Sequence, residues 1–590
     1  MKNKVSDATS AFGFVANLYL KKVPYKIIAE CILSALKSIL VVINSVWLLE
    51  ALIEIVVDEQ VYSRGIKLLI LVTGINIFVS VIQNMYNYCI KYKSDLKIRQ
   101  YLEKLIMTHA EKLPLKYYEN SEFYTIVKQA EKAATVTIFS AYNDLIQLLG
   151  NVAALISAVI VAVNIAPGLL LFVVFTLPMI LVSKKYGKLF SEKNVSLIFW
   201  ERKKQYARDA WMNKEFARIT KITNAWKIID KHYEEGYTGG NQIHKESSRA
   251  LIKWNFLTTE FSITFIMIVC YIYGIFASVY NDGFSISGFS VMFVAVMNMI
   301  SRVRKIYKQY ENFCGYRVEM QPLHTFLKLN PEDEHAKGIQ PGEFRSLEFR
   351  NVWFSYDNEK WALEDVSFKI EAGEKTVILG YNGAGKSTLI KLLLRLYDVD
   401  KGEILYNGVN IKQLSLQGYR EKFAAAFQDF RLFSISLAEN IKMNECTDED
   451  KEKIKDALVQ LDKEPWINDM DRLIGREYET EGLVLSGGQQ QWLAVTRLYF
   501  HNFEIAVLDE PSAALDPISA KQMQTEVEKL IGNRSMIMIS HDMAAANSAD
   551  RILFFENGRL IAQGTHKEVL EENIQYAEFY NCQAKNYRSV

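Results

Sequence analysis

The sequence lacks an excess of either charge. In 590 residues, 69 Lys and Arg face 68 Asp and Glu, so the formal net charge is +1. Proteins that bind polyanions concentrate basic charge, and this balance therefore gives no support for a nucleic-acid partner or an acidic one. We expect no binding of nucleic acid.

Paired cysteines and a cleavable signal are missing as well. The first apolar run begins near Tyr25, is too long for a secretion signal and leads to no small-residue cleavage site. It is expected to stay in the membrane as a span. No two cysteines stand at the spacing of a metal site or a redox motif, so we expect six free thiols. These are Cys31, Cys89, Cys270, Cys314, Cys446 and Cys582.

The chain is too long for one hydrophobic core, and its two halves differ in pattern. Residues 1–310 carry long apolar stretches, whereas residues 345–585 alternate strand-like and helix-like segments. A helix needs roughly 20 apolar residues to cross a bilayer. Six stretches reach that length, which is more than the core of one soluble domain could hold. They are residues 25–49, 66–90, 140–163, 165–183, 257–280 and 284–303.

The connections between these stretches predict their orientation. Three connections are short, whereas residues 91–135 and 184–255 are long and rich in Lys and Arg, as in "KYKSDLKIRQ" and "ERKKQYARDA". Basic loops stay on the cytoplasmic side, so both termini are expected inside the cell. The long connections are expected to extend the membrane helices and to end in short crossing helices at residues 114–124 and 222–235. Their aromatic side chains either need a partner or pack locally.

Polar residues within the spans are costly and are therefore candidates for function. They could line a substrate path, lie at the headgroup interface or pair between helices. No ring of carboxylates marks a conduit for cations. The residues are Glu50, Glu54, Asp144, Gln147, Asn151 and Glu260.

The second half carries a phosphate-binding loop, "GYNGAGKST", between a strand-like and a helix-like segment. Its glycines fit the pattern G-x-x-x-x-G-K-[ST], in which backbone N–H groups and a helix N-terminus close on phosphate oxygens. Lys386 is expected to bridge the β- and γ-phosphates of a nucleotide, and Ser387 to hold Mg²⁺. The expected nucleotide contacts in this loop are Gly380, Asn382, Gly383, Gly385, Lys386, Ser387 and Thr388.

Two further strand ends supply acid–base groups. The apolar run Ile505–Leu508 is followed by Asp509 and Glu510. Asp509 could orient Mg²⁺ through water, and Glu510 is placed to act as general base. The run "SMIMIS" ends in His541, whose imidazole could contact the γ-phosphate.

The order "GYNGAGKST", "AFQDF", "LSGGQ", "VLDEPSAALD", "SHD" resembles the nucleotide-binding domain of the ABC transporter superfamily. Six spans with two long basic loops ahead of it resemble the exporter-type half-transporter. The resemblance implies an all-α membrane domain at residues 1–310, a linker at 311–345 and an α/β P-loop ATPase domain at 346–585.

In that family the ATPase domains pair head to tail. The resemblance implies that Ser486, Gly487, Gly488 and Gln489 contact ATP held on the opposite subunit's phosphate loop. Tyr356 matches the aromatic that stacks on adenine, and Gln428 matches the glutamine that touches Mg²⁺ and the attacking water. Residues 513–516 match the loop that crosses the dimer axis. The crossing helices would dock near Gln428.

Three departures from the family pattern stand out. Trp492 replaces the usual arginine after the signature, and the acidic run "EYETEG" follows the exporter pattern only loosely. The first span begins so early that no peptidase domain is expected ahead of it.

The sequence thus predicts a plasma-membrane exporter half, with its termini and ATPase domain in the cytoplasm, that binds ATP and Mg²⁺. It would act as a homodimer on a peptide or amphiphilic solute. Alternatives are a multidrug or lipid exporter, an importer on the same fold (for iron chelates, for example), and one half of a heterodimer. A soluble ATPase factor and an ATP-gated channel are rivals from other classes.

Overall fold

The computed structural model describes residues 3–42, 44, 62–165, 170–280, 286–332, 338–461, 463–540 and 543–588. The chain divides into two compact units. One comprises residues 1–113 and 117–330, and the other comprises residues 114–116 and 331–590. The division at residue 330 falls inside the segment predicted as a linker.

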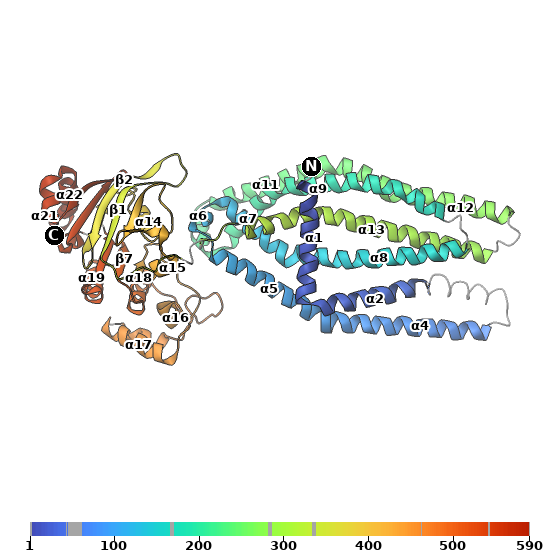
Figure 1. Ribbon diagram of the computed structural model, residues 1–590, viewed down its shortest axis with the longest axis horizontal. Coiled ribbons are helices and arrows are strands. Elements are labelled where there is room, and N and C mark those ends of the chain that lie inside the picture. Colours follow the sequence, from blue (N-terminus) through green and yellow to red (C-terminus); the bar gives the residue numbers. More distant parts are fainter. Residues whose placement is uncertain are drawn as a thin grey trace. The chain divides into compact units, whose positions relative to one another are not determined.

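The first unit is built from helices over its described residues, many of them long (Figure 1). The longest is α9, with 43 residues, and the end of α13 continues well past the apolar stretch that it contains. The helices are α1 (Asn3–Lys22), α2 (Pro24–Val42), α4 (Tyr62–Met85), η3 (Tyr86–Lys91), α5 (Tyr92–Glu111), α6 (Leu115–Tyr118), α7 (Ser121–Lys132), η4 (Ala133–Thr137), α8 (Ile138–Ile165), α9 (Leu170–Met212), α10 (Lys214–Ile222), α11 (Ala225–Asn255), η6 (Phe256–Phe261), α12 (Ser262–Tyr280) and α13 (Ile286–Leu327).

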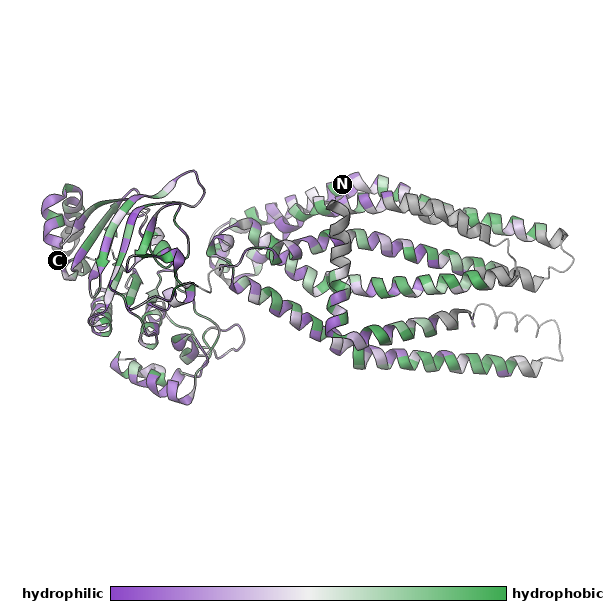
Figure 2. Cartoon of the chain, viewed as in Figure 1, coloured by the Kyte–Doolittle hydropathy of each residue, from purple (hydrophilic) through white to green (hydrophobic). Residues whose placement is uncertain are grey.

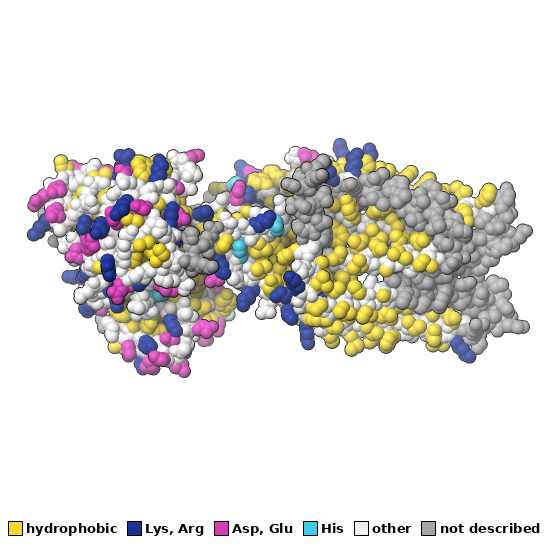
Figure 3. Space-filling view, viewed as in Figure 1, with side chains coloured by type: hydrophobic (Ala, Val, Ile, Leu, Met, Phe, Trp, Pro, Cys, Tyr) yellow, Lys and Arg dark blue, Asp and Glu magenta, His cyan; other side chains and the backbone are white. Residues whose placement is uncertain are grey.

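Each of the six apolar stretches coincides with a helix over its described residues. Among those residues, two helices are long and apolar enough to cross a membrane, Gly65–Glu111 and Glu122–Ile160. Hydrophobic side chains cover much of the visible described face of this unit (Figure 3), and α4 is hydrophobic along most of its length (Figure 2). On α4, Ile70 and Phe78 are 64% and 65% exposed. A contiguous apolar surface of this kind needs an apolar environment or a partner.

The polar residues predicted within the third span pair with α13. The Asn151 side chain donates to Gln309 Oε1 at 3.4 Å and accepts from Arg302 at 3.2 Å. The carboxylate of Asp144 accepts from Asn312 and Tyr316, at 2.8 and 2.9 Å.

Seven residues before Asp144, the Thr137 hydroxyl donates to Glu319 at 2.8 Å. These contacts form a polar seam between α13 and residues 137–151. For Asp144 and Asn151 the structure thus shows pairing between helices. Gln147 is exposed, while Glu50, Glu54 and the side chain of Glu260 lie outside what the structure describes.

Short helices do occur at the ends of the long ones, but one of them is displaced from its predicted place. Helix α6 and the start of α7 cover the predicted segment 114–124. The second short helix is α10, which ends where the predicted segment 222–235 begins, so that prediction is wrong in position. Trp226 and Tyr233 instead lie in the first turns of the long helix α11.

The second unit contains two sheets (Figure 1). A four-stranded antiparallel sheet has the order β2-β1-β4-β5, and a six-stranded sheet has the order β10-β9-β3-β8-β7-β6. The strands are β1 (Ser346–Ser355), β2 (Trp361–Glu371), β3 (Lys375–Gly380), β4 (Lys401–Tyr406), β5 (Val409–Asn410), β6 (Phe423–Ala426), β7 (Ile505–Asp509), β8 (Ser535–Ile539), β9 (Arg551–Glu556) and β10 (Arg559–Gly564).

Strands β9, β3, β8, β7 and β6 run parallel. Strands β7 and β8 are buried throughout, as expected for parallel strands covered on both faces. The helices of this unit are α14 (Lys386–Leu393), α15 (Leu416–Arg420), α16 (Leu437–Lys442), α17 (Asp448–Gln460), α18 (Gly487–Thr496), α19 (Pro517–Ile531), α20 (Met543–Ser548), α21 (His566–Glu572) and α22 (Ile574–Arg588).

Parallel pairing brings the carboxyl ends of β3, β6, β7 and β8 to one edge of the sheet. The segments that follow these ends hold the phosphate loop, Gln428, Glu510 and Ser540. Ligands of open α/β sheets bind outside this edge. The fold therefore gathers motifs that lie up to about 160 residues apart in sequence.

All six cysteines are free, which confirms the expectation from their spacing.

Candidate nucleotide-binding site

The phosphate loop needs glycine at three positions for backbone reasons. Gly380, Gly383 and Gly385 have φ angles of 149°, 80° and 96°, which side-chain-bearing residues rarely adopt. A Cβ on Gly380 would also overlap the carbonyl oxygen of Phe555 in the neighbouring strand β9. A Cβ on Gly385 would lie 2.8 Å from the carbonyl oxygen of Ala362. The loop is thus held in a shape that presents its backbone to a ligand.

We expect Gly380→Ala to destabilise the protein more than Gly383→Ala does. Both substitutions meet the strain of a positive φ, about 1–2 kcal/mol, but around Gly383 a Cβ would find nothing within 4 Å. Thermal unfolding of the two purified variants measures the difference, and Gly383→Ala is the matched control. Equal apparent Tm values would contradict the steric argument.

Lys386, the first residue of α14, points back into the loop. Its Nζ donates to the carbonyl oxygens of Gly380 and Tyr381, at 2.7 and 3.1 Å. Burial lowers the pKa of this ammonium, while Glu510 and Asp509 act in the opposite direction. The lysine therefore stands at the helix N-terminus, where the backbone also favours an anion.

Asp509 is suited to a cation. It is 7% exposed, and its Oδ1 has no hydrogen-bond partner within the described part of the chain. Burial raises the pKa of its carboxyl, and Glu510 adds to the rise, whereas a hydrogen bond with Ser387 opposes it. An orphaned buried carboxylate oxygen beside a hydroxyl fits Mg²⁺, which binds through one or two carboxylates together with phosphate oxygens. Among the described residues no three His, Cys, Asp or Glu form a dedicated cage.

Glu510 and Gln428 lie side by side. The amide of Gln428 donates to Glu510 Oε2 at 3.2 Å, and the backbone N–H of Glu510 donates to the Ile539 carbonyl at 3.0 Å. Glu510 adopts a φ of 47°, which is unusual for a residue with a long side chain. Strain of this type is concentrated at functional sites, because the surrounding structure has to hold the residue in place. Here it turns the carboxylate out of the strand toward Gln428.

The ring of Tyr356 lies next to the phosphate-loop helix. It is 47% exposed, and its hydroxyl lies 3.1 Å from Thr388 Oγ1. Phe354 and Tyr397 support it edge-on, at centroid distances of 4.9 and 5.4 Å. A supported, half-exposed ring offers a face on which a base can stack.

We expect Tyr356→Ala to weaken ATP binding by roughly 5- to 150-fold, because stacking of a base on an aromatic ring contributes about 1–3 kcal/mol. Tyr356→Phe keeps the ring and removes only the hydrogen bond to Thr388, so it should stay close to wild type. Titration with ATP, followed by isothermal calorimetry, measures both. Equal losses in the two variants would point to the hydroxyl instead of the ring.

The Ser486 turn forms a second helix N-terminus. The Ser486 hydroxyl accepts from the Gln489 N–H at 3.3 Å, and the Gln489 side chain accepts from the Ser486 N–H at 2.8 Å. This capping box fixes the start of α18. Ser486 and Gly487 are exposed, and a Cβ on Gly487 would find nothing within 4 Å. The helix thus presents an open, small-residue N-terminus.

Two further contacts around α18 escaped the reading of the sequence. Gln491 is 7% exposed, and its Oε1 accepts from the Ala514 N–H at 3.0 Å, which ties the signature helix to residues 513–516. Trp492 is buried, with the Lys463 ammonium 4.2 Å from its ring centroid. Trp492, which departs from the family pattern, is therefore a core residue of this unit. In the sequence, Gln491 is a polar residue directly before Trp492, and nothing else in the pattern indicates its contact with Ala514.

The structure brings together the loop residues, Lys386, Asp509, Glu510 and Gln428 at one sheet edge. Tyr356 joins them through Thr388. His541 lies outside the described residues.

The chain is similar to several known proteins. Residues 363–513 match the family model described as ABC transporter. A Haemophilus influenzae protein described as ATP-dependent lipid A-core flippase is 33% identical over 311 residues, 51% of this chain and 52% of that protein. The Escherichia coli K12 protein of the same description is 24% identical over 533 residues, 87% of this chain and 88% of that protein. The match to the Haemophilus influenzae protein therefore spans about half of that relative's length.

A solved structure described as a bacterial Atm1-family ABC exporter with ATP bound superposes with a TM-score of 0.80. It covers 96% of this chain and 98% of that chain at 19% sequence identity. At this level of identity the superposition establishes the fold of both units.

Proposed function

Because the chain belongs to the ABC transporter superfamily and has the exporter-type half-transporter fold, we propose that it exports a solute across the plasma membrane with energy from ATP. The observation that carries the proposal is the sheet edge where Lys386, Asp509, Glu510 and Gln428 converge. A pump needs a site that binds a nucleoside triphosphate and also a group that activates water, and the residues at this edge fit both roles.

In the proposed reaction the phosphate loop and Lys386 hold the β- and γ-phosphates. Ser387, Asp509 and Gln428 would hold Mg²⁺, which neutralises charge on the phosphate oxygens when bound. Glu510 accepts a proton from the attacking water, and the Gln428 amide orients its carboxylate at 3.2 Å. His541 would contact the γ-phosphate.

The proposed working unit is a dimer. The Ser486 turn is exposed, and the N-terminus of the helix that it begins suits an anion brought by another chain. One copy would therefore cap the ATP bound by the other, with Gly487, Gly488 and Gln489 as further contacts. Since a homodimer of this chain contains two complete sites, it is favoured over a heterodimer.

The membrane topology belongs to the same proposal. Six spans would place the long basic segments, both termini and the ATPase unit in the cytoplasm. ATP binding would close the paired ATPase units and turn the membrane domain outward. It can do so only through a higher affinity of ATP for the closed state.

The proposed solute is a peptide or another amphiphile. The relatives described as lipid A-core flippases favour a lipid-like molecule as the second candidate. ATPase assays of the purified dimer in lipid nanodiscs, against a panel of peptides, lipids and drugs, test the solute class. The Glu510→Gln variant serves as blank.

Vesicle transport distinguishes the mechanisms. A pump accumulates a labelled solute against its gradient, a channel only equilibrates it, and an importer moves it toward the ATPase side. Failure of every panel member to accumulate with ATP would contradict export.

A further inference from the structure

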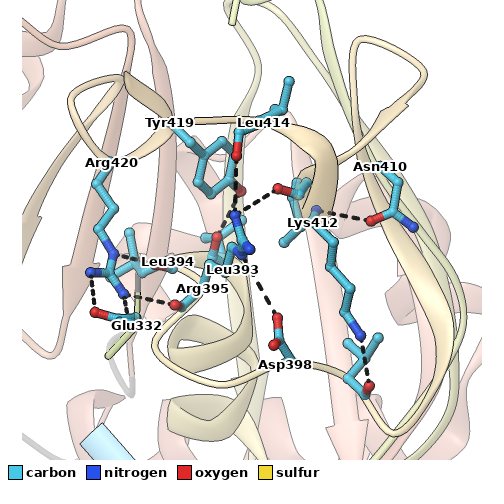
Figure 4. A network of polar contacts seen from close by, with 12 residues as sticks. Glu332, Leu393, Leu394, Arg395, Asp398, Asn410, Lys412, Leu414, Tyr419 and Arg420 are labelled. Atoms are coloured by element: carbon cyan, nitrogen blue, oxygen red, sulfur yellow. Dashed lines mark hydrogen bonds and ion pairs between the residues drawn. The ribbon is translucent and has the colours of Figure 1, made fainter. Parts of the chain in front are cut away.

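The segment 331–345, here called the connector, lies between α13 and β1, and its described residues include Glu332, which is bound beside the phosphate-loop helix α14 of the second unit. Glu332 accepts two hydrogen bonds from the guanidinium of Arg420, at 2.7 Å from Nη2 and 3.0 Å from Nη1 (Figure 4). Both side chains are partly buried, with 23% of Glu332 and 31% of Arg420 exposed. This two-pronged geometry is the strongest form of an Arg–carboxylate pair.

Arg420 also holds the end of α14. Its Nε donates to the Leu394 carbonyl at 3.2 Å, and its Nη2 donates to the Arg395 carbonyl at 2.7 Å (Figure 4). The last carbonyls of a helix have no partner within the helix, and a cation there is favourable. Helix α14 is about 12 Å long at 1.5 Å per residue, and Lys386 is its first residue. Arg420 therefore binds the two residues just past the C-terminus of the helix that begins with Lys386.

A second set of bonds joins the connector to the same place. The Ile339 N–H donates to the Gln413 carbonyl at 3.0 Å, and the Ser415 N–H donates to the Ile339 carbonyl at 2.9 Å. Arg395, at a φ of 50°, donates to the carbonyls of Ile411 and Leu414 in that segment, at 3.0 and 3.2 Å. The connector, residues 411–415 and the end of α14 thus form one hydrogen-bonded block.

We propose that Glu332 is a positioning residue for ATP. Acting through Arg420, it fixes the far end of α14 and hence the placement of the phosphate loop. Glu332 follows the end of α13 by five residues in the chain, and we expect the affinity for ATP to depend on whether it is paired with Arg420. The proposal rests on the proposed function, because it assigns the connector a role at the ATP site.

The test uses the full-length protein in nanodiscs of Escherichia coli polar lipids. Binding of the fluorescent analogue TNP-ATP is titrated in the Glu510→Gln background, and KM and kcat for ATP are measured with Glu510 intact. Glu332→Gln keeps the shape and removes the charge. We expect it to raise Kd and KM about three- to tenfold, with kcat within about twofold. Arg420→Lys keeps the charge but loses the fork, and should shift Kd in the same direction.

Glu348→Gln is the matched control. Glu348 also accepts a two-pronged pair, from Arg350 at 2.7 and 2.8 Å, with 28% of its side chain exposed, but this pair lies on β1. A change in Tm alone, equal in Glu332→Gln and Glu348→Gln, with Kd unchanged, would overturn the proposal. Equal increases in Kd in the two variants would overturn it too.

A second variant reaches the block without touching the ion pair. A Cβ on Gly338 would lie 2.5 Å from the backbone of Leu414 and Ser415, so Gly338→Ala pushes the connector away from that segment. We expect the same rise in Kd, and an unchanged Kd would contradict the role of the connector. If wild-type protein hydrolysed no ATP, the proposed function would fail, while the TNP-ATP titration would still report on Glu332.

Discussion

Replacing Glu510 with Gln lowers the turnover of ATP by about 10²- to 10⁴-fold and leaves ATP binding intact. A positioned general base contributes about that factor to a rate, and Gln cannot accept the proton of the attacking water. The phosphate loop and Lys386 are unchanged, so the affinity for ATP persists. Phosphate release by the purified protein measures turnover, and calorimetry measures binding.

Glu556→Gln is a suitable control for this experiment. Glu556 also ends a strand, β9, and is partly buried, but it does not take part in the Gln428 contact. Its substitution should leave turnover within about twofold of wild type. If Glu510→Gln turned over ATP at the wild-type rate, another group would be the base. If it lost ATP binding as well, Glu510 would have a structural role.

Two inactive variants restore part of the activity when they are combined in one dimer. Lys386→Ala removes the phosphate contact, and Ser486→Arg blocks the open helix N-terminus, so each homodimer is inactive. In a mixed dimer, one site receives both defects, whereas the other combines an intact loop with an intact signature turn. Up to about half of the wild-type activity per dimer is therefore expected if the two sites act independently.

The mixed dimer needs two different affinity tags, so that sequential purification yields only dimers with one copy of each variant. ATPase activity of this preparation is compared with the two homodimers, purified in the same way. If each chain completed its own site, every site in the mixed dimer would carry one defect. Activity at the level of the inactive homodimers would then rule out sites shared between chains.

The parts of the site that lie at strand ends could be predicted from the sequence. The phosphate loop, Asp509 and Glu510 each follow a short apolar run, and parallel pairing brings such ends to one edge. Gln428 was expected only from the family resemblance. The contrast between an N-terminal half with long apolar stretches and a strand-rich C-terminal half likewise predicted an all-helical unit followed by an α/β unit. These features are local in sequence or follow from general rules of sheet pairing.

Contacts through space could not be predicted in the same way. Gln491 reaches Ala514 across 23 residues, and Glu332 reaches Arg420 across 88. The sequence distances within these two pairs follow no rule, so the pairs could not be told from polar residues that are simply exposed. Lys26 is another example, because it is 1% exposed and binds Asp95 at 2.5 Å, although it stands near the start of an apolar stretch.

Helix boundaries were the other weak point. Helix α10 ends at Ile222, and the break before α11 falls at Thr223 and Asn224. Trp226 and Tyr233 share a helical face, and the short helix was therefore predicted at residues 222–235, beyond this break. The first helix, α1, was missed for a related reason. It precedes the first apolar run, and its buried residues Val15, Leu18 and Tyr19 are few.

The polar seam has a mechanical consequence. Its anchors on one side, Thr137, Asp144 and Asn151, recur every seven residues. A slip of one helical turn, about 5.4 Å, would break all of these bonds together. Residues 137–151 and α13 should therefore behave as a single stiff strut that tilts or rotates as one body. Any rearrangement that exposes the membrane domain first to one side and then to the other has to occur around this strut.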